Sequence, residues 1–216
     1  MKDLVIYGAG GFGREVAAML KRLNKSIPTW NLLGFVDDNT QLYPKGTSNE
    51  YGVILGNIDF INQYDKPLSV VLAFGKPMII EKVYRKIANP NIDFPNLIGV
   101  EAKILDEDNF QMGIGNIICS YATMSCNVRL GNFNVFNNRC SVGHDAQIGD
   151  FNTFMTATRI SGDTRIGTLN FFGVGSVLLQ GLTVGTQTTI AAGAVVMRKT
   201  KDNQLYMGNP AKKVEL

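Results

Sequence analysis

Residues 130–154 read LGNFNVFNNRCSVGHDAQIGDFNTF, and this stretch decides the fold of the chain. Within it, apolar residues recur every six positions, at Leu130, Phe136, Val142, Ile148 and Phe154. The same register extends in both directions, so that every sixth residue from Met112 to Val196 is apolar. With 45% hydrophobic residues in the chain, such an unbroken run in a preset register would arise by chance about once in 10⁵.

A second period of eighteen residues, three times six, lies on top of the first. It is carried by Gly113, Gly131, Gly149, Gly167 and Gly185, and by Asn116, Asn134, Asn152 and Asn170. A helix would scatter residues spaced by six around its axis, and an antiparallel sheet would show a period of two. The repeat therefore predicts a left-handed parallel β-helix with three short strands per coil and one apolar residue per side pointing inward. We expect the glycine after each inward residue to provide backbone freedom at a corner.

The first 96 residues follow a different pattern, in which short apolar runs alternate with a helical spacing. Strands are expected over residues 4–7, 32–36 and 69–74, and helices over residues 14–23 and 78–88. Residues 26–30 and 43–51 have the composition of loops, and residues 89–95 form a linker containing two prolines. The order predicts a small parallel α/β domain over residues 1–96, followed by the β-helix over residues 97–216.

Composition excludes several functional classes. The chain has 216 residues and a net charge of +3, and no run of basic residues points to a nucleic acid or a membrane surface. No apolar run is long enough to span a membrane, and the acidic Asp3 is atypical of a signal peptide, so we expect a cytoplasmic protein. Three cysteines without a CxxC pair fit reduced thiols. His144 is the only histidine, which excludes a zinc site with three histidines from one chain; no metal is expected.

Several motifs carry a resemblance to a known family. They are the hexapeptide rhythm, Gly143-His144-Asp145 followed by Ile148-Gly149-Asp150, then Phe172-Gly173-Val174-Gly175, Gly208-Asn209-Pro210-Ala211-Lys212, and the N-terminal Gly8-Ala9-Gly10-Gly11-Phe12-Gly13. Nearly the whole chain resembles the hexapeptide-repeat sugar acetyltransferases of the PglD and NeuD type. The resemblance implies a Rossmann-like domain for a nucleotide-linked amino sugar, or a chain that acetylates sialic acid. It further implies acetyl-CoA as the acetyl donor, bound in grooves between the solenoids of a homotrimer.

The N-terminal glycine motif fits GxGxxG between a strand and a helix, where backbone amides can bind phosphate. Asp37 ends the second strand, at a place suited to a ribose hydroxyl. The motif would equally serve NAD or simply allow a helix to pack on a strand, although about 95 residues leave little room for a dinucleotide. The resemblance implies substrate contacts at Gly10, Gly11, Asp37, Asp38 and Gly75.

His144 is expected on the outer surface, because Val142 two residues earlier points inward. Imidazole, with an ordinary pKa of about 6.5, suits the removal of a proton from an acceptor at neutral pH. Asp145 can orient the ring, or it is simply an exposed carboxylate at a turn. Gly162 follows His144 by eighteen residues, and the resemblance implies that its amide stabilises the oxyanion; alternatively the turn itself requires glycine.

The resemblance also implies contacts to acetyl-CoA at Thr153, Val174 and Ala192. The combined prediction is an acetyl-CoA-dependent acetyltransferase that acts on a nucleotide-linked amino sugar, specifically by N-acetylation of a UDP-4-amino-4,6-dideoxyhexose, with His144 as general base. Three alternatives stay open at this point: a sialic acid O-acetyltransferase, an NAD-linked oxidoreductase, and a noncatalytic scaffold that binds a sugar nucleotide.

Overall fold

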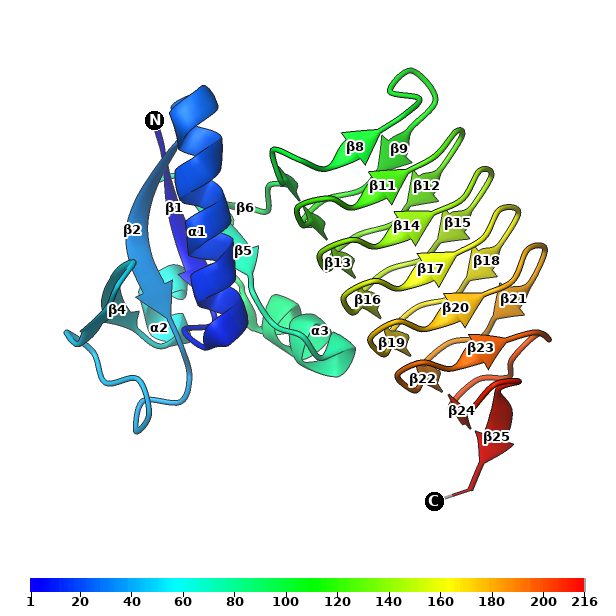
Figure 1. Ribbon diagram of the computed structural model, residues 1–216. Helices are drawn as coiled ribbons and strands as arrows, with labels where there is room; N and C mark the ends of the chain where they lie inside the picture. The colour runs from blue at the N-terminus through cyan, green and yellow to red at the C-terminus, as the bar shows by residue number, and fades with distance from the viewer. Residues whose placement is uncertain (216) are drawn as a thin grey trace. The chain divides into compact units, whose positions relative to one another are not determined.

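The structure is a computed structural model that describes residues 1–215 (Figure 1). It contains two compact units. One comprises Met1–Gly75 and Ile79–Pro95, and the other comprises Lys76–Met78 and the chain from Asn96 onward. The fold class predicted from the sequence, an α/β domain followed by a parallel β-helix, is confirmed.

The N-terminal unit is built on a six-stranded sheet with the order β3-β4-β2-β1-β5-β6. All neighbouring pairs are parallel except β3 with β4. Its helices and strands are β1 (Lys2–Tyr7), α1 (Gly11–Ser26), β2 (Trp30–Val36), β3 (Ser48–Asn49), β4 (Gly52–Gly56), α2 (Ile58–Asn62), β5 (Leu68–Leu72), α3 (Pro77–Lys86) and β6 (Ile92–Asp93).

The sequence predicted β1, α1, β2, β5 and α3 but missed the elements between β2 and β5. β4 has glycine at both ends, and α2 has only five residues, so neither shows a clear period. The segment expected to be a linker also contains β6, which pairs with β5 at the edge of the sheet. Short elements of this kind are held by their neighbours rather than by their own sequence pattern.

The second unit is a parallel β-helix whose strands form three faces (Figure 1). Face 1 contains β7 (Leu97–Ile98), β10 (Ile117–Ile118), β13 (Val135–Phe136), β16 (Thr153–Phe154), β19 (Phe171–Phe172), β22 (Thr189–Ile190), β24 (Leu205–Met207) and the antiparallel β25 (Lys212–Val214). Face 2 contains β8 (Lys103–Ile104), β11 (Thr123–Met124), β14 (Ser141–Val142), β17 (Arg159–Ile160), β20 (Val177–Leu178) and β23 (Val195–Val196). Face 3 contains β9 (Gln111–Met112), β12 (Arg129–Leu130), β15 (Gln147–Ile148), β18 (Arg165–Ile166) and β21 (Thr183–Val184).

The β-helix begins before the first residue of the six-residue register. Ile98 and Ile104 are inward residues of β7 and β8, and they pair with Ile118 and Met124 of the next coil. Stepping back by six from Met112 does not reach them, because eight residues rather than six separate Ile104 from Met112. The extra length lies in an acidic segment, residues 105–110, that widens one corner of the first coil.

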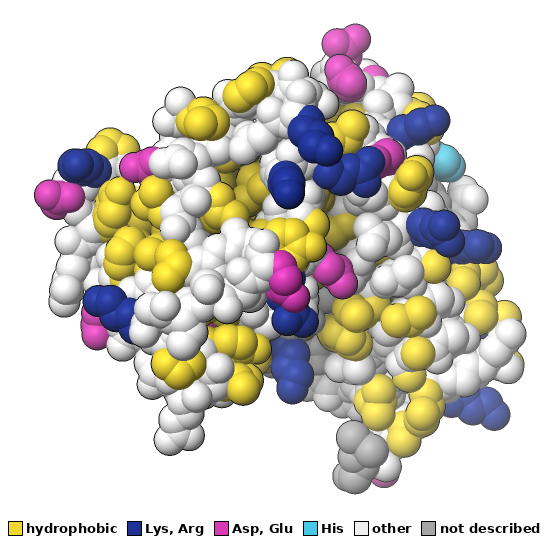
Figure 2. Space-filling view, turned by 60° about the vertical axis from the view of Figure 1, so that its left-hand side comes forward, with side chains coloured by type: hydrophobic (Ala, Val, Ile, Leu, Met, Phe, Trp, Pro, Cys, Tyr) yellow, Lys and Arg dark blue, Asp and Glu magenta, His cyan; other side chains and the backbone are white. Residues whose placement is uncertain are grey.

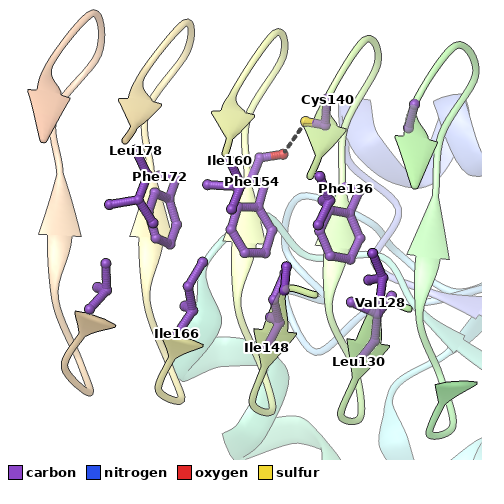
Figure 3. Packing of buried hydrophobic residues seen from close by; sticks show 14 of the residues in the cluster. Val128, Leu130, Phe136, Cys140, Ile148, Phe154, Ile160, Ile166, Phe172 and Leu178 are labelled. Carbon is purple, nitrogen blue, oxygen red and sulfur yellow. Dashed lines mark hydrogen bonds between the residues drawn. The ribbon is translucent and has the colours of Figure 1, made fainter. Parts of the chain in front are cut away.

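In each strand from β9 to β23 the second residue points into the prism, as the register predicted (Figure 3). Phe136, Phe154 and Phe172 stack along the axis, with ring centroids 4.6 and 4.7 Å apart. These spacings match the distance between neighbouring strands, so each ring packs on its copy in the next coil. Burying each such side chain stabilises the fold by about 1.5–3 kcal/mol.

A buried ladder of asparagines explains the second period of eighteen residues. Asn116, Asn134, Asn152 and Asn170 are fully buried. The Oδ1 atom of each of the first three accepts hydrogen bonds from the backbone N–H and the side-chain amide of the next, at 2.9–3.1 Å. Buried amides need such partners, so the side chain must recur in every coil.

The glycine after each inward residue was expected to provide backbone freedom at a corner, and this reason is wrong. None of Gly113, Gly131, Gly149, Gly167 and Gly185 has a positive φ. The left-handed residue stands three places after each inward residue, as at Asp145 with φ 58° and Asp163 with φ 52°. At Gly149 a Cβ atom would lie 2.9 Å from the carbonyl oxygen of Gly167. Glycine is needed because the next coil approaches so closely.

Within residues 1–215, no helix combines the length and apolar character needed to cross a membrane.

Candidate active site

His144 lies at the corner between faces 2 and 3 of the β-helix. We call this corner the His144 edge and define it as residues 125–128, 143–146, 161–164 and 179–182. The His144 side chain is 51% exposed, and the chain's only histidine is visible at the surface (cyan in Figure 2). The His144 side chain therefore points outward, as expected from the inward position of Val142.

The imidazole of His144 is held by the carboxylate of the next residue. Nδ1 of His144 lies 2.8 Å from Oδ2 of Asp145. In a regular strand two successive side chains point to opposite sides, but the left-handed backbone of Asp145, with φ 58°, turns both to the same side. Asparagine and aspartate tolerate this conformation better than most residues.

The charge of Asp145 determines which imidazole nitrogen carries the proton. Hydrogen bonds from His144 and from Asn127 lower the pKa of the Asp145 carboxyl below its ordinary value. An ionised carboxylate only accepts hydrogen bonds, so Nδ1 of a neutral His144 must be the N–H donor. Nε2 is then left with its lone pair and can accept a proton.

Gly162 lies beside Nε2, one coil after His144. A Cβ atom at this position would overlap the imidazole at Nε2. Gly162 has no positive φ, so its backbone conformation does not demand glycine, whereas the adjacent ring does. Its N–H donates to no acceptor within residues 1–215. A backbone N–H that has no acceptor within residues 1–215 and lies next to Nε2 of an imidazole provides the two groups that acyl transfer requires.

The three residues assigned to acetyl-CoA occupy two different environments. Val174 and Ala192 are exposed and lie one coil apart at the corner between faces 1 and 2, which we call the Ala192 edge. Their backbone N–H groups also have no acceptor within the described chain. Thr153 lies on β16 of face 1 and is fully buried, and its Oγ1 has no hydrogen-bond partner among residues 1–215. The structure therefore groups Val174 with Ala192 and leaves Thr153 apart.

The glycines of the N-terminal turn fall into two groups. Gly8 and Gly13 are required by packing, because a Cβ at Gly8 would lie 2.7 Å from the Ala73 carbonyl oxygen and one at Gly13 would overlap the Gly8 carbonyl oxygen. Gly11 and Gly75 have nothing within 4 Å of such a Cβ, and Gly10 has only the Tyr43 hydroxyl at 3.6 Å. The three glycines predicted to contact substrate are thus the ones with open space beside them.

The start of α1 leaves donors available near these open glycines. Gly10 is the N-cap residue, no side chain caps the helix, and the first turn contains no acidic residue. The first amides of a helix lack partners within the helix and carry partial positive charge. This turn can therefore receive a phosphate group.

Asp37 holds the glycine turn by accepting two backbone hydrogen bonds. Its Oδ2 accepts from the Ala9 N–H at 2.9 Å, and its Oδ1 accepts from the Asn39 N–H at 2.9 Å. A carboxylate oxygen can accept more than one hydrogen bond, so a ribose hydroxyl can still join this arrangement. Asp37 nevertheless has a structural role that the sequence did not indicate.

Asp38 is exposed and contacts groups of α2 and α3. Its Oδ1 accepts from the Ile58 N–H at 3.1 Å, and its Oδ2 lies 3.3 Å from the Lys86 ammonium. Partial burial opposes ionisation of Asp38, but the nearby Tyr7 hydroxyl, the Ile58 amide and Lys86 together lower its pKa. Burial, and then the Asp38 carboxylate, raise the pKa of Tyr7. Asp38 thus links β2, α2 and α3.

Sequence reasoning missed Asn127, which stands one coil before Asp145. Its Nδ2 donates to Oδ1 of Asp145 at 2.7 Å. The separation of eighteen residues could have identified it, because that spacing stacks residues in adjacent coils. Among residues 1–215, no group of three or more His, Cys, Asp or Glu side chains is arranged to hold a metal ion.

Comparisons with known proteins agree with this architecture. Residues 3–87 match the family described as the PglD N-terminal domain. The acetyltransferase domain of PglB from Neisseria gonorrhoeae, solved with acetyl coenzyme A, is 28% identical with a TM-score of 0.87, and the similarity covers 99% of both chains. WeeI from Acinetobacter baumannii is 26% identical with a TM-score of 0.88, over 99% of this chain and 100% of that one.

A third solved structure shows the same fold at lower identity. PerB from Caulobacter crescentus, in complex with CoA and GDP-perosamine, is 22% identical with a TM-score of 0.86, over 100% of this chain and 98% of that one. A search of curated proteins gives no match. Residues 3–87 therefore carry the PglD N-terminal domain, and over nearly its full length the chain is similar to the PglB acetyltransferase domain and to WeeI, as expected for a hexapeptide-repeat sugar acetyltransferase of the PglD type.

Proposed function

We propose that the protein transfers the acetyl group of acetyl-CoA to the amino group of a nucleotide-linked sugar, specifically a UDP-4-amino-4,6-dideoxyhexose. His144 is the general base and Gly162 the oxyanion donor. The observation that carries the proposal is the juxtaposition of two groups. Nε2 of His144, with Nδ1 bound to Asp145 at 2.8 Å, lies beside Gly162, whose N–H has no acceptor within the described residues.

The chemistry follows from the roles of these groups. The acceptor nitrogen attacks the thioester carbonyl while Nε2 of His144 takes one of its protons. The C–N bond forms, and the Gly162 N–H donates to the oxyanion of the tetrahedral intermediate. When the intermediate collapses, the C–S bond breaks and the thiolate of CoA leaves, taking the proton from the imidazolium. Asp145 stabilises the imidazolium in between.

The N-terminal unit supplies the preference for a nucleotide-linked acceptor in this proposal. The uncapped start of α1 and the open space at Gly10, Gly11 and Gly75 suit a diphosphate. Asp37 holds the turn by accepting hydrogen bonds from the Ala9 and Asn39 amides at 2.9 Å, and in this proposal its carboxylate also binds a ribose hydroxyl. Free sialic acid has neither a diphosphate nor a ribose and would use neither feature.

The proposed assembly is a homotrimer arranged around face 2. The His144 edge and the Ala192 edge border this same face on opposite sides. If three copies pack face 2 around a threefold axis, the Ala192 edge of one copy meets the His144 edge of its neighbour. The outward residues of face 2 include the small, uncharged Thr123, Ser141, Val177 and Val195 beside Lys103 and Arg159, whereas those of face 3 are all polar, namely Gln111, Arg129, Gln147, Arg165 and Thr183. A monomer at micromolar concentration in sedimentation would contradict this assembly.

The substrate is tested with purified protein and acetyl-CoA against three acceptors: the UDP-4-amino sugar, a GDP-linked amino sugar and free sialic acid. Release of the CoA thiol and the mass of the product are measured. We expect turnover with the UDP-linked amine, and UDP alone should bind in calorimetry and compete with the acceptor. Turnover of sialic acid without UDP binding would instead establish the O-acetyltransferase alternative. A fluorescence response to NADH without acetyl transfer would favour the oxidoreductase.

A further inference from the structure

We propose that Asn127 is a positioning residue for acetyl transfer, acting through Asp145 on the orientation of the His144 imidazole. The inference rests on the proposed function, because it takes His144 as the general base. Nothing in the motif at residues 143–145 includes Asn127, which comes from the preceding coil of the His144 edge.

The contacts define a chain of three side chains. Nδ2 of Asn127 donates to Oδ1 of Asp145 at 2.7 Å, and Oδ2 of Asp145 lies 2.8 Å from Nδ1 of His144. Each carboxylate oxygen of Asp145 therefore has its own partner, one from the preceding coil and one from the imidazole. The Asp145 N–H also donates to the Cys126 carbonyl oxygen at 3.0 Å, so the preceding coil holds both the backbone and the side chain of Asp145.

The carboxylate needs this support because it is exposed. The side chain of Asp145 is 52% exposed, so water can compete for both of its oxygens. Without the amide of Asn127, rotation about the side-chain bonds would let the carboxylate leave Nδ1 of His144. The ring could then rotate away from Gly162 and carry its proton on either nitrogen. A base that is misplaced by about 1 Å can lose a large part of its effect.

A purely structural role for Asn127 is the competing explanation. Asn127 has φ 54°, a conformation in which asparagine is common for conformational reasons alone. The chain contains a second Asn–Asp pair that controls for loss of the side-chain contact, although its asparagine does not have a positive φ. Asn132, five residues later at another corner, donates from Nδ2 to Oδ1 of Asp150 at 3.0 Å, also across one coil. No histidine is joined to that pair, so it serves as a structural control.

The test uses Asn127→Gly, because glycine keeps the left-handed backbone and removes only the side chain. We expect kcat to fall by roughly three- to tenfold, while KM for acetyl-CoA and for the acceptor changes by less than about twofold. Asn132→Ala should lower the melting temperature and leave kcat of the folded enzyme unchanged. Equal effects of the two substitutions on kcat and on melting temperature would overturn the proposal.

A double-mutant cycle isolates the route through Asp145. In the Asp145→Ala background, Asn127→Gly should change kcat by less than about twofold, since its target is absent. The same loss in both backgrounds would show that Asn127 does not act through Asp145.

Asn127→Asp adds a signature in pH. Two neighbouring carboxylates raise the pKa of one of them, and the shared proton can replace the missing amide hydrogen. The activity of Asn127→Asp relative to wild type should therefore decrease as the pH rises through that pKa. A ratio independent of pH would count against the positioning role.

The outcomes also separate this inference from the function it rests on. If His144→Ala and Asp145→Ala both retain wild-type turnover, the proposed mechanism itself fails. If these two variants lose turnover while Asn127→Gly matches the wild type, only the role of Asn127 is refuted.

Discussion

Two corners of the β-helix have the same backbone conformation but differ in the hydrogen-bond acceptors of their backbone amides. We call the corner between faces 3 and 1 the ladder edge. Here backbone amides donate hydrogen bonds to side chains of the following coil. The donors are the N–H groups of Ile114, Asn132, Thr168 and Thr186, and the acceptors are Asn132, Asp150, Thr186 and Asp202. The Asp150 N–H, at the same place in the repeat, is the exception and has no acceptor within residues 1–215. At the His144 edge the amides of Cys126, His144, Gly162 and Gln180 donate to no group within residues 1–215.

The difference shows how a repeated scaffold acquires a reactive site. Both corners use left-handed residues at the same place in the repeat, such as Phe151 and Asp145 with φ 56° and 58°. On the ladder edge the polar side chains satisfy the backbone and stabilise the stack. On the His144 edge Asn127, Asp145 and His144 bind one another, and the N–H groups two places after each inward residue have no acceptor within residues 1–215. Stability and reactivity are thus divided between corners.

The strongest test of this division is His144→Ala. Loss of the general base should reduce turnover by about 10² to 10⁴. The fold should persist because the side chain is 51% exposed. Turnover and the melting temperature are measured together, with Thr186→Ala on the ladder edge as the matched variant. That control should lose melting temperature and keep its turnover, and an active His144→Ala enzyme would remove the basis for the mechanism.

The next test compares the same substitution at two glycines. In Gly162→Ala the new methyl group would meet the imidazole, which can move because it is the end of a side chain. We therefore expect kcat to fall by roughly 10- to 100-fold with little loss of stability. In Gly149→Ala the methyl group would lie 2.9 Å from the Gly167 carbonyl oxygen, which is backbone. That variant should lose about 1–3 kcal/mol of stability and retain kcat when folded.

If both glycine variants lose stability equally, the distinction between the two edges is wrong. Thermal denaturation and steady-state kinetics on the same preparations decide the question.

Asp145→Asn should have a smaller effect on turnover than His144→Ala. The amide keeps the shape of the carboxylate but loses the charge that stabilises the imidazolium, and it can hold the wrong tautomer of the ring. We expect kcat to decrease roughly 10- to 100-fold, with KM for acetyl-CoA nearly unchanged. A fall in kcat as large as that of His144→Ala would mean that Asp145 has a more direct part in the reaction.

The smallest expected effect is on stability as a function of pH. The pKa of Asp145 is lowered, first by the hydrogen bond from His144 and then by that from Asn127. A lowered pKa in the folded state contributes stability above the ordinary value, and that contribution is lost as the pH falls through the folded-state pKa. Between about pH 5 and 3 the melting temperature of wild type should therefore decrease more than that of Asp145→Asn, by less than about 2 °C for so exposed a group. Parallel curves for the two proteins would contradict the shift.

A regular repeat makes much of this protein predictable from its sequence. Because eighteen residues complete one coil, a separation in sequence becomes a neighbour in space, and the inward register and the place of His144 followed directly. The same rule applied to Asp145 would have found Asn127. Residues 37–68 were harder, because β4 and α2 have five residues each and too little sequence to show a period.

The sequence by itself determined the β-helix, its register from Met112 to Val196 and the outward position of His144, because the spacing of inward residues allows no other placement. Only the tertiary structure decided that successive side chains at 144 and 145 face each other, since this depends on a left-handed backbone at Asp145. It also decided that Asp37 accepts hydrogen bonds from the amides of Ala9 and Asn39, while the Gly162 amide has no acceptor in the part of the chain that the structure describes. Whether a polar group is already satisfied depends on which atoms surround it in space, and no local pattern of residues records that.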